Sequence, residues 1–189
     1  MDHIYDQPQF GEDWFTYSRF YLDMVQKFPT GSKFVEIGSW KGKSSAYMAV
    51  EIANSAKQIE FTCVDTFLGS TELQDCAGIS ELYNIFISNM KPLESYYNVL
   101  KMTSLEASSL FEDKSLDFVF IDGCHEYECV KTDIISWMPK VKSGGIFAGH
   151  DYRPLNYKGE TSGVFVAVNE LLSPRFYVNY GDCWILNID

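Results

Sequence analysis

Short apolar runs alternate along this chain with stretches in which apolar residues recur at helical spacing. Short runs indicate buried strands, whereas a recurrence every three to four positions indicates an amphipathic helix. This pattern predicts strands at residues 34–37, 60–65, 97–101, 116–121, 146–148, 176–180 and 183–188. It predicts helices at residues 14–28, 44–54, 80–90, 105–111, 127–141 and 164–172.

The regular succession of strand and helix is typical of an α/β sheet with right-handed parallel crossovers. Gly181-Asp182 links the last two strands and has the composition of a tight hairpin, so the last strand should run antiparallel to its neighbour. We therefore predict a single Rossmann-like, doubly wound sheet of seven strands. The sheet should be mostly parallel, with an antiparallel last strand in a C-terminal hairpin and helices on both faces.

The segment ahead of the first strand carries an aromatic stripe that Pro29 and Gly31 bring to an end. The stripe is expected to pack as core, and the alternatives are a lid over a substrate or a contact in a homodimer. Residues 1–30 are accordingly predicted to form an N-terminal arm and amphipathic helix, and residues 31–189 the ligand-binding domain. The stripe consists of Trp14, Tyr17, Tyr21, Val25 and Phe28.

Composition narrows the class of protein. The 189 residues are 46% hydrophobic, enough to bury a sizeable core, and the formal net charge of -11 repels nucleic acids and anionic membrane surfaces. Five cysteines are scattered without a disulfide framework, and the N-terminus lacks the basic start and apolar core of a signal peptide. We expect a cytoplasmic protein with a small-molecule partner and no nucleic-acid or membrane partner.

The first strand is followed by a glycine turn that suits a small ligand. A phosphate-binding loop would need four residues between its glycines, but Gly38 and Gly42 enclose three, and Ile37 stands where the first glycine belongs. A dinucleotide fingerprint would need a glycine where Trp40 stands. Both alternatives are disfavoured, and with them a nicotinamide-dependent oxidoreductase.

The remaining candidate ligand is S-adenosylmethionine, which has an adenosine but no phosphate. Glu36, Gly38 and Gly42 can serve its aminoacyl end, and its sulfonium needs no basic residue. Asp65 ends the second strand, where a carboxylate can accept hydrogen bonds from the two ribose hydroxyls.

Four segments carry a resemblance to a known group, namely residues 34–42, 64–69, 116–127 and 144–152. In these segments the chain resembles the class I S-adenosylmethionine-dependent methyltransferases, and within them the small macrocin or sugar O-methyltransferases and cephalosporin-hydroxylase-like proteins. The last two segments are the more specific. The cofactor-binding residues expected from the turn and the resemblance are Glu36, Gly38, Ser39, Gly42, Asp65, Thr66, Ser104 and Asp122.

The resemblance also implies catalytic roles. Asp122, His150 and Asp151 match positions that ligate a divalent metal in family members, and His125 matches a proposed general base assisted by Asp122. His150 replaces a carboxylate of that pattern, which favours manganese, iron or zinc over magnesium. Whether a metal is bound at all stays open. For Ser104, helix capping together with Thr103 is an equal alternative.

The function expected from these features is transfer of a methyl group to a hydroxyl of a small polar acceptor, a sugar or glycosylated metabolite. The loops at residues 66–80 and 152–162 are expected to shape the pocket for this acceptor. A hydroxyl is a poor nucleophile at neutral pH, so His125 would remove its proton. The alternative from another class is a non-catalytic module that binds S-adenosylmethionine. Cys124 and Cys129 match no standard zinc spacing and are expected to pack as small apolar residues.

Overall fold

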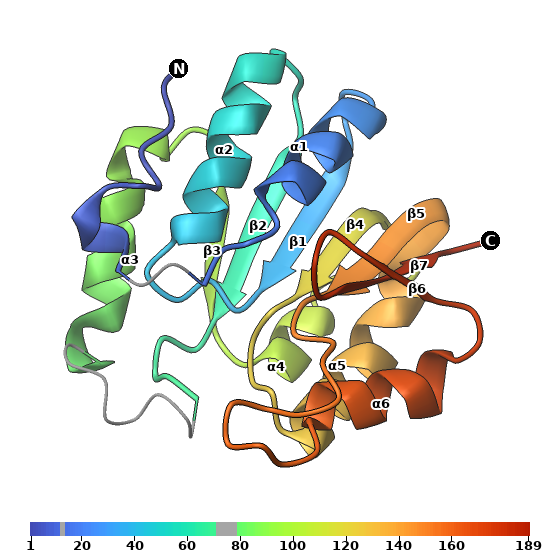
Figure 1. The fold of residues 1–189 in the computed structure, drawn as a ribbon. Helices are drawn as coiled ribbons and strands as arrows, with labels where there is room; N and C mark the ends of the chain where they lie inside the picture. Colours follow the sequence, from blue (N-terminus) through green and yellow to red (C-terminus); the bar gives the residue numbers. More distant parts are fainter. Residues whose placement is uncertain (12–13, 71–78) are drawn as a thin grey trace.

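A computed structural model describes residues 1–11, 14–70 and 79–189 (Figure 1). The strands are β1 (Lys33–Ile37), β2 (Glu60–Asp65), β3 (Asn98–Lys101), β4 (Leu116–Ile121), β5 (Val141–Gly149), β6 (Tyr177–Asn179) and β7 (Cys183–Asn187). The helices are α1 (Ser18–Lys27), α2 (Lys43–Ser55), α3 (Leu82–Met90), α4 (Ser104–Ser108), α5 (Tyr127–Trp137) and α6 (Gly163–Leu172). Within the described ranges, none of these helices has the length and apolarity needed to cross a membrane.

The strands form one seven-stranded sheet in the order β3-β2-β1-β4-β5-β7-β6, which confirms the predicted fold class. Strands β1 to β5 pair in parallel, and β7 runs antiparallel to both β5 and β6. Because the chain leaves β1 toward β2 on one side and returns to β4 on the other, the switch point lies between β1 and β4. In open α/β sheets the ligand crevice lies at such a point, beyond the carboxyl ends of the strands.

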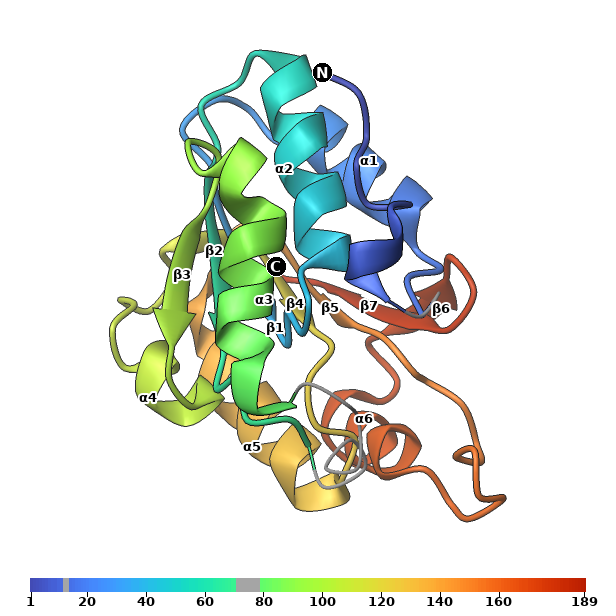
Figure 2. The same ribbon diagram turned by 90° about the vertical axis from the view of Figure 1, so that its left-hand side faces the viewer.

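Alternation along the central strands divides the core into two layers. Phe118 and Phe120 of β4 pack into the layer that contains α1, α2 and α3, whereas Val119 and Ile121 pack into the layer that contains α4, α5 and α6. The two sets of helices lie on opposite faces of the sheet (Figures 1 and 2). All six residues of β4 are buried, and all but Asp117 are apolar, as expected for a central strand that is covered on both faces.

Several boundaries differ from the sequence expectation. Helix α5 ends at Trp137 instead of residue 141, because Pro139 lies in a 3-10 turn that follows it and cannot continue the helical hydrogen bonding. Strand β5 begins at Val141 instead of residue 146 and includes Gly144 and Gly145, where the register against β4 shifts. The helix predicted at residues 105–111 is shorter, from Ser104 to Ser108.

The N-terminal segment packs on the sheet through most of the aromatic stripe, and its α-helix forms only in its second half. Helix α1 begins at Ser18, and Trp14 lies before it with 50% of its surface exposed. Phe15 and Tyr17 are buried although they precede the helix. Buried aromatic residues thus continue ahead of the helix, and the apolar pattern in the sequence extends beyond the helix itself. This explains why the helix was predicted to begin too early.

Candidate active site

The turn after β1 brings the ends of two central strands into contact. Gly38 has φ +91°, and a Cβ at this position would come within 2.1 Å of the Asp122 carbonyl oxygen. The backbone N–H of Asp122 donates to the Ile37 carbonyl at 2.7 Å. Glycine at position 38 therefore lets the β1 and β4 ends approach closely enough to form the floor of a crevice.

Glu36 lies beneath this turn and is buried. Its carboxylate accepts hydrogen bonds from the hydroxyls of Tyr21 (2.8 Å), Ser39 (3.0 Å) and Ser45. Burial raises the pKa of Glu36, and these hydrogen bonds oppose the shift. Glu36 does not line the crevice in the described structure, so its position fits support of the turn from below better than direct contact with a ligand.

Gly42 and Ser39, two other predicted cofactor-binding residues, support the turn from inside the protein. Gly42 has φ +90° and precedes the first residue of α2, and its Cα faces the side chains of Met90 and Phe86. The Ser39 hydroxyl donates to Glu36, and its side chain is buried. Neither residue is among those described as lining the crevice. Their cofactor contacts stay a prediction.

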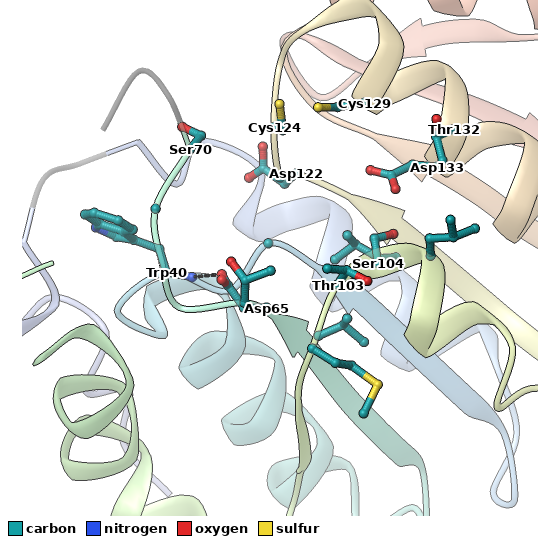
Figure 3. A pocket seen from close by; sticks show the side chains of 18 of the residues that line it. Trp40, Asp65, Ser70, Thr103, Ser104, Asp122, Cys124, Cys129, Thr132 and Asp133 are labelled. Carbon is teal, nitrogen blue, oxygen red and sulfur yellow. Dashed lines mark hydrogen bonds between the residues drawn. The ribbon is translucent and has the colours of Figure 1, made fainter. Parts of the chain in front are cut away.

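The crevice is a cavity of about 500 Å³ at the carboxyl ends of β1, β2 and β4 (Figure 3). This volume falls within the range of small-molecule pockets, roughly 300–1,000 Å³. The predicted residues that line it are Gly38, Asp65, Thr66, Ser104 and Asp122. Lining residues that the sequence did not assign to the cofactor include Trp40, Met102, Thr132 and Asp133.

Asp65 fixes the glycine turn from the neighbouring strand. Its Oδ2 accepts from the N–H groups of Ser39 and Trp40, each at 2.9 Å, and its Oδ1 accepts from the N–H of Phe67 at 2.6 Å. Burial raises the pKa of Asp65, against the effect of these hydrogen bonds. A carboxylate offers about four acceptor positions, so about one is left for a ribose hydroxyl. The predicted contact with both hydroxyls would require the turn to adjust.

The far wall of the cavity contains a buried carboxyl. Asp133 of α5 lies opposite Asp65 in Figure 3 and is 7% exposed. Burial raises its pKa to about 6, and a hydrogen bond with Ser104 opposes the shift. Ser104 also accepts from the Trp137 indole at 2.7 Å, while Thr103 caps α4 in a capping box with Glu106. Thr103 is therefore the residue that caps α4, whereas Ser104 lines the cavity.

Two aspartates and two histidines form a connected cluster beside the cavity. His150 Nδ1 lies 3.5 Å from Asp122 Oδ1 and 3.2 Å from Asp151 Oδ2, and His125 Nε2 lies 3.1 Å from Asp151 Oδ2. Asp151 has φ +57°, a region that L-residues seldom occupy and that is often found at functional sites. All four residues that the resemblance singled out thus meet in one place.

The N-terminal segment adds two residues to this cluster, and the sequence did not predict this contribution. The Tyr17 hydroxyl donates to Asp122 Oδ2 at 2.6 Å, and Thr16 Oγ1 is hydrogen-bonded to His150 Nε2 at 3.1 Å. The Tyr17 ring is buried and packs against the His150 ring with centroids 4.7 Å apart. Periodicity could report only that Tyr17 is buried, because the partner of its hydroxyl is more than one hundred residues away.

Charge pairing dominates the electrostatics of the cluster. Burial would lower the pKa of His150, but the hydrogen bonds and negative charges of Asp122 and Asp151 outweigh it and raise the pKa to about 10. Burial would raise the pKa of Asp151, but hydrogen bonds from His125 and His150 outweigh it and hold this pKa well below its usual value. Without a metal, the cluster is therefore a cationic His150 between carboxylates.

A second cavity of about 430 Å³ begins at His125. Polar groups of the loop before α6 line much of it, including Asn156, Lys158, Glu160 and Thr161. The sequence expected this loop, residues 152–162, to shape an acceptor pocket. The other expected loop, residues 66–80, lies partly outside the described residues.

The donor set of the cluster is compatible with a divalent metal. One atom each of Asp122, His150 and Asp151 lie within 4.8 Å of one another. Two carboxylates and one imidazole suit manganese, iron or zinc, and a metal would replace the proton on His150 Nδ1. These residues are the ones expected from the sequence, and the metal itself stays a proposal.

The strand order, the antiparallel β7 and the cavity at the switch point are those of a class I S-adenosylmethionine-dependent methyltransferase. The family described as "Methyltransferase domain" matches residues 35–152, more than half of the chain, and the chain belongs to this family. The match begins in β1 and ends just after Asp151, so it contains the glycine turn and the Asp–His cluster.

Solved structures share the fold at low sequence identity. The O-methyltransferase NovP has a TM-score of 0.67 at 17% identity, over 92% of this chain and 79% of that one. An O-methyltransferase from Bacillus cereus in complex with S-adenosylhomocysteine has a TM-score of 0.62 at 17% identity, over 92% and 80%. CalS11, a TDP-rhamnose 3'-O-methyltransferase, has a TM-score of 0.60 at 13% identity, over 90% and 76%.

A curated relative is similar over part of the chain. The uncharacterized protein y4gI of Sinorhizobium fredii (strain NBRC 101917 / NGR234) is 29% identical over 121 residues. That stretch is 63% of this chain but 13% of the relative, so the chain spans a small fraction of that protein's length.

Proposed function

We propose that this protein is an O-methyltransferase that transfers the methyl group of S-adenosylmethionine to a hydroxyl of a small, carbohydrate-containing acceptor. The observation that carries the proposal is a continuous path of contacts between the two cavities. Asp122 lines the first cavity, and its contacts lead through His150 and Asp151 to His125, which lines the second.

The first cavity suits the methyl donor. Its volume of about 500 Å³, its glycine floor at Gly38 and its carboxyl groups at Asp65 and Asp133 can take an adenosine and an aminoacyl chain. S-adenosylmethionine supplies an electrophilic methyl on a sulfonium. The family membership and the S-adenosylhomocysteine complex of the Bacillus cereus neighbour support this assignment.

The second cavity is proposed to bind the acceptor. Asn156, Lys158 and Thr161 offer hydrogen-bonding groups of the kind that polyhydroxylated ligands need. CalS11 acts on TDP-rhamnose, which supports a sugar-containing acceptor for this chain by analogy. The polar lining favours an acceptor hydroxyl over an apolar substrate.

His125 is proposed as the general base. When its Nε2–H donates to Asp151, the lone pair that can take a proton is on Nδ1, an arrangement in which the carboxylate orients the imidazole. His125 then removes the hydroxyl proton as the oxygen attacks the methyl carbon, and Asp151 stabilises the imidazolium. The carbon–sulfur bond breaks in the same step, and S-adenosylhomocysteine leaves as a neutral thioether. A divalent metal held by Asp122, His150 and Asp151 would acidify the hydroxyl when bound.

The test replaces His125 and follows methyl transfer to a panel of sugars and nucleotide sugars. His125→Ala should lower kcat by roughly 10²–10⁴-fold, the usual contribution of a general base, and leave the affinity for S-adenosylhomocysteine unchanged. His3→Ala is the matched control, because His3 is hydrogen-bonded to Glu51 of α2 and not to a residue of the cluster. Turnover of His125→Ala at the wild-type rate would exclude His125 as the general base. If neither the wild type nor either variant turned over any acceptor of the panel, the result would favour a non-catalytic module that binds S-adenosylmethionine.

A further inference from the structure

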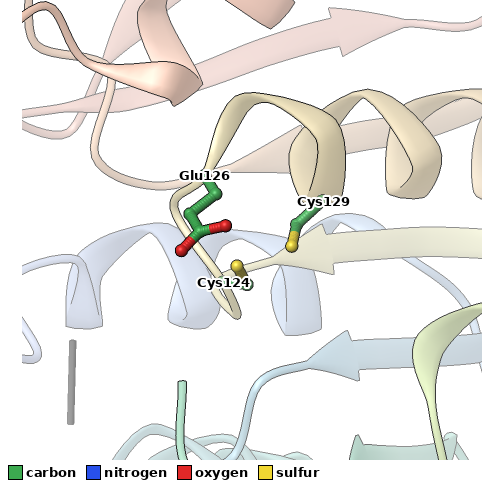
Figure 4. Close-up of side chains that lie close together, drawn as sticks. All are labelled: Cys124, Glu126 and Cys129. Carbon is green, nitrogen blue, oxygen red and sulfur yellow. The ribbon is translucent and has the colours of Figure 1, made fainter. Parts of the chain in front are cut away.

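A second group of metal-ligating side chains lies beside the first cavity and takes no part in the proposed chemistry. Cys124, Glu126 and Cys129 each place one ligand atom within 4.8 Å of the others. Figure 4 shows the two sulfur atoms and the carboxylate converging between the end of β4 and the first turn of α5. Both cysteines are free thiols and line the cavity wall.

The path of the backbone explains why these three side chains come together although their spacing matches no standard zinc pattern. Glu126 is the residue that precedes the first turn of α5, and Cys129 is the third residue of that helix. The chain turns between Cys124 and Glu126, so Cys124 comes back against the helix start and its sulfur lies within 4.8 Å of the Cys129 sulfur. Spacing alone argued for ordinary packing, whereas the fold brings a carboxylate and two thiols together.

We infer that Cys124, Cys129 and Glu126 form a binding site for a soft divalent cation, and zinc is the ion that we expect it to bind. Tetrahedral zinc holds sulfur and oxygen donors roughly 3.5–3.8 Å apart, and the observed limit of 4.8 Å needs only small side-chain rotations to reach that spacing. Two thiolates and one carboxylate give the zinc complex a residual negative charge. The N-terminus of α5 favours that charge.

Three protein ligands leave one tetrahedral position open. Because Cys124 and Cys129 line the cavity, that position faces the cavity and can be taken by water or by a donor atom of a bound ligand. The Asp122, His150 and Asp151 set differs in chemistry, since it has oxygen and nitrogen donors and no sulfur. The two sites therefore differ in their preference for soft cations. This inference does not rest on the proposed methyl transfer.

The test titrates the reduced, metal-free protein with Cd²⁺ and records the ultraviolet absorption of cadmium–thiolate bonds, with Zn²⁺ as the competitor. We expect the absorption to saturate at about one Cd²⁺ per chain and to be displaced by Zn²⁺. Cys124→Ser and Cys129→Ser should each remove most of it. Glu126→Gln should weaken binding by roughly tenfold or more.

Two matched variants make the result specific. Glu128→Gln removes a carboxylate from the same helical turn but not from the cluster, and it should bind Cd²⁺ as the wild type does. Asp151→Asn disables the other cluster and should leave the thiolate absorption unchanged. Circular dichroism shows whether each variant is folded. The inference is overturned if the wild type shows no cadmium–thiolate absorption, or if a folded Cys124→Ser and a folded Cys129→Ser both retain it.

Discussion

At the scale of single residues, side chains far apart in the sequence hold the candidate catalytic carboxylate in place. Asp122 directly follows β4, and its partner Tyr17 lies in the N-terminal segment. A hydrogen bond to a charged group contributes about 1.5–3 kcal/mol. Tyr17 is therefore a positioning residue in this account, because its hydroxyl acts through Asp122.

Tyr17→Phe should lower kcat by roughly tenfold or more, since it removes the hydroxyl that orients Asp122 and leaves the ring in place. Tyr21→Phe is the matched control. It removes a buried hydroxyl of the same segment, and that hydroxyl contacts Glu36 instead of Asp122. Steady-state kinetics at saturating methyl donor separates the two. Equal turnover in both variants would argue against a positioning role for Tyr17.

Asp133 provides a prediction on pH. Its pKa is about 6 in the folded protein and near 3.8 when exposed. Folding therefore favours the protonated form, and the associated stability is complete below pH 3.8 and lost as the pH rises through 6. At pH 7–8 the ionised carboxyl costs about 3 kcal/mol at most.

Asp133→Asn keeps a neutral isostere beside Ser104. It should raise the free energy of unfolding by about 1–3 kcal/mol at pH 7–8 and have little effect near pH 4. Urea unfolding at both pH values measures the difference. An effect of the same size at both pH values would show that packing, and not ionisation, is responsible.

At the scale of elements, the contact between the ends of β1 and β4 shapes the cavity. A Cβ at Gly38 would overlap the Asp122 carbonyl oxygen at 2.1 Å, so one strand end would have to move. Gly38→Ala should destabilise the protein by roughly 3 kcal/mol or more. Gly159→Ala is the control, because that glycine also has positive φ but has no atom within 4 Å of the added Cβ.

Gly159→Ala should therefore cost only about 1 kcal/mol of backbone strain. Denaturant unfolding of the two variants gives the comparison. Equal losses of stability would mean that conformation, and not the close approach of β4, accounts for glycine at position 38.

Much of the element order could be predicted because periodicity reports burial. The strands follow from short apolar runs such as that of β4, and the hairpin follows from Gly181-Asp182, which links β6 and β7. The regular succession of strand and helix indicated helices on both faces of the sheet. Boundaries were less predictable where buried residues lie outside regular structure. Phe15 and Tyr17 are buried ahead of α1, and Val141 already belongs to β5.

At the scale of the whole molecule, the candidate site could be predicted in part because strand ends meet at one edge of the sheet. Asp65 ends a predicted strand and was expected in the crevice for that reason, whereas Asp122 and Asp151 were expected from the family resemblance. Contacts with Tyr17 and the wall position of Asp133 were not predictable, since they depend on how α1 and α5 pack on the sheet. The sequence also could not separate lining residues such as Gly38 from supporting residues such as Glu36.

The central claim is that the cavity over the β1–β4 switch point binds S-adenosylmethionine. Isothermal titration calorimetry of the protein with S-adenosylhomocysteine, and separately with NADH, tests it most directly. The account predicts one S-adenosylhomocysteine site per chain with a Kd on the order of micromolar, about -8 kcal/mol, and no heat of binding with NADH. Binding of NADH without binding of S-adenosylhomocysteine would contradict it.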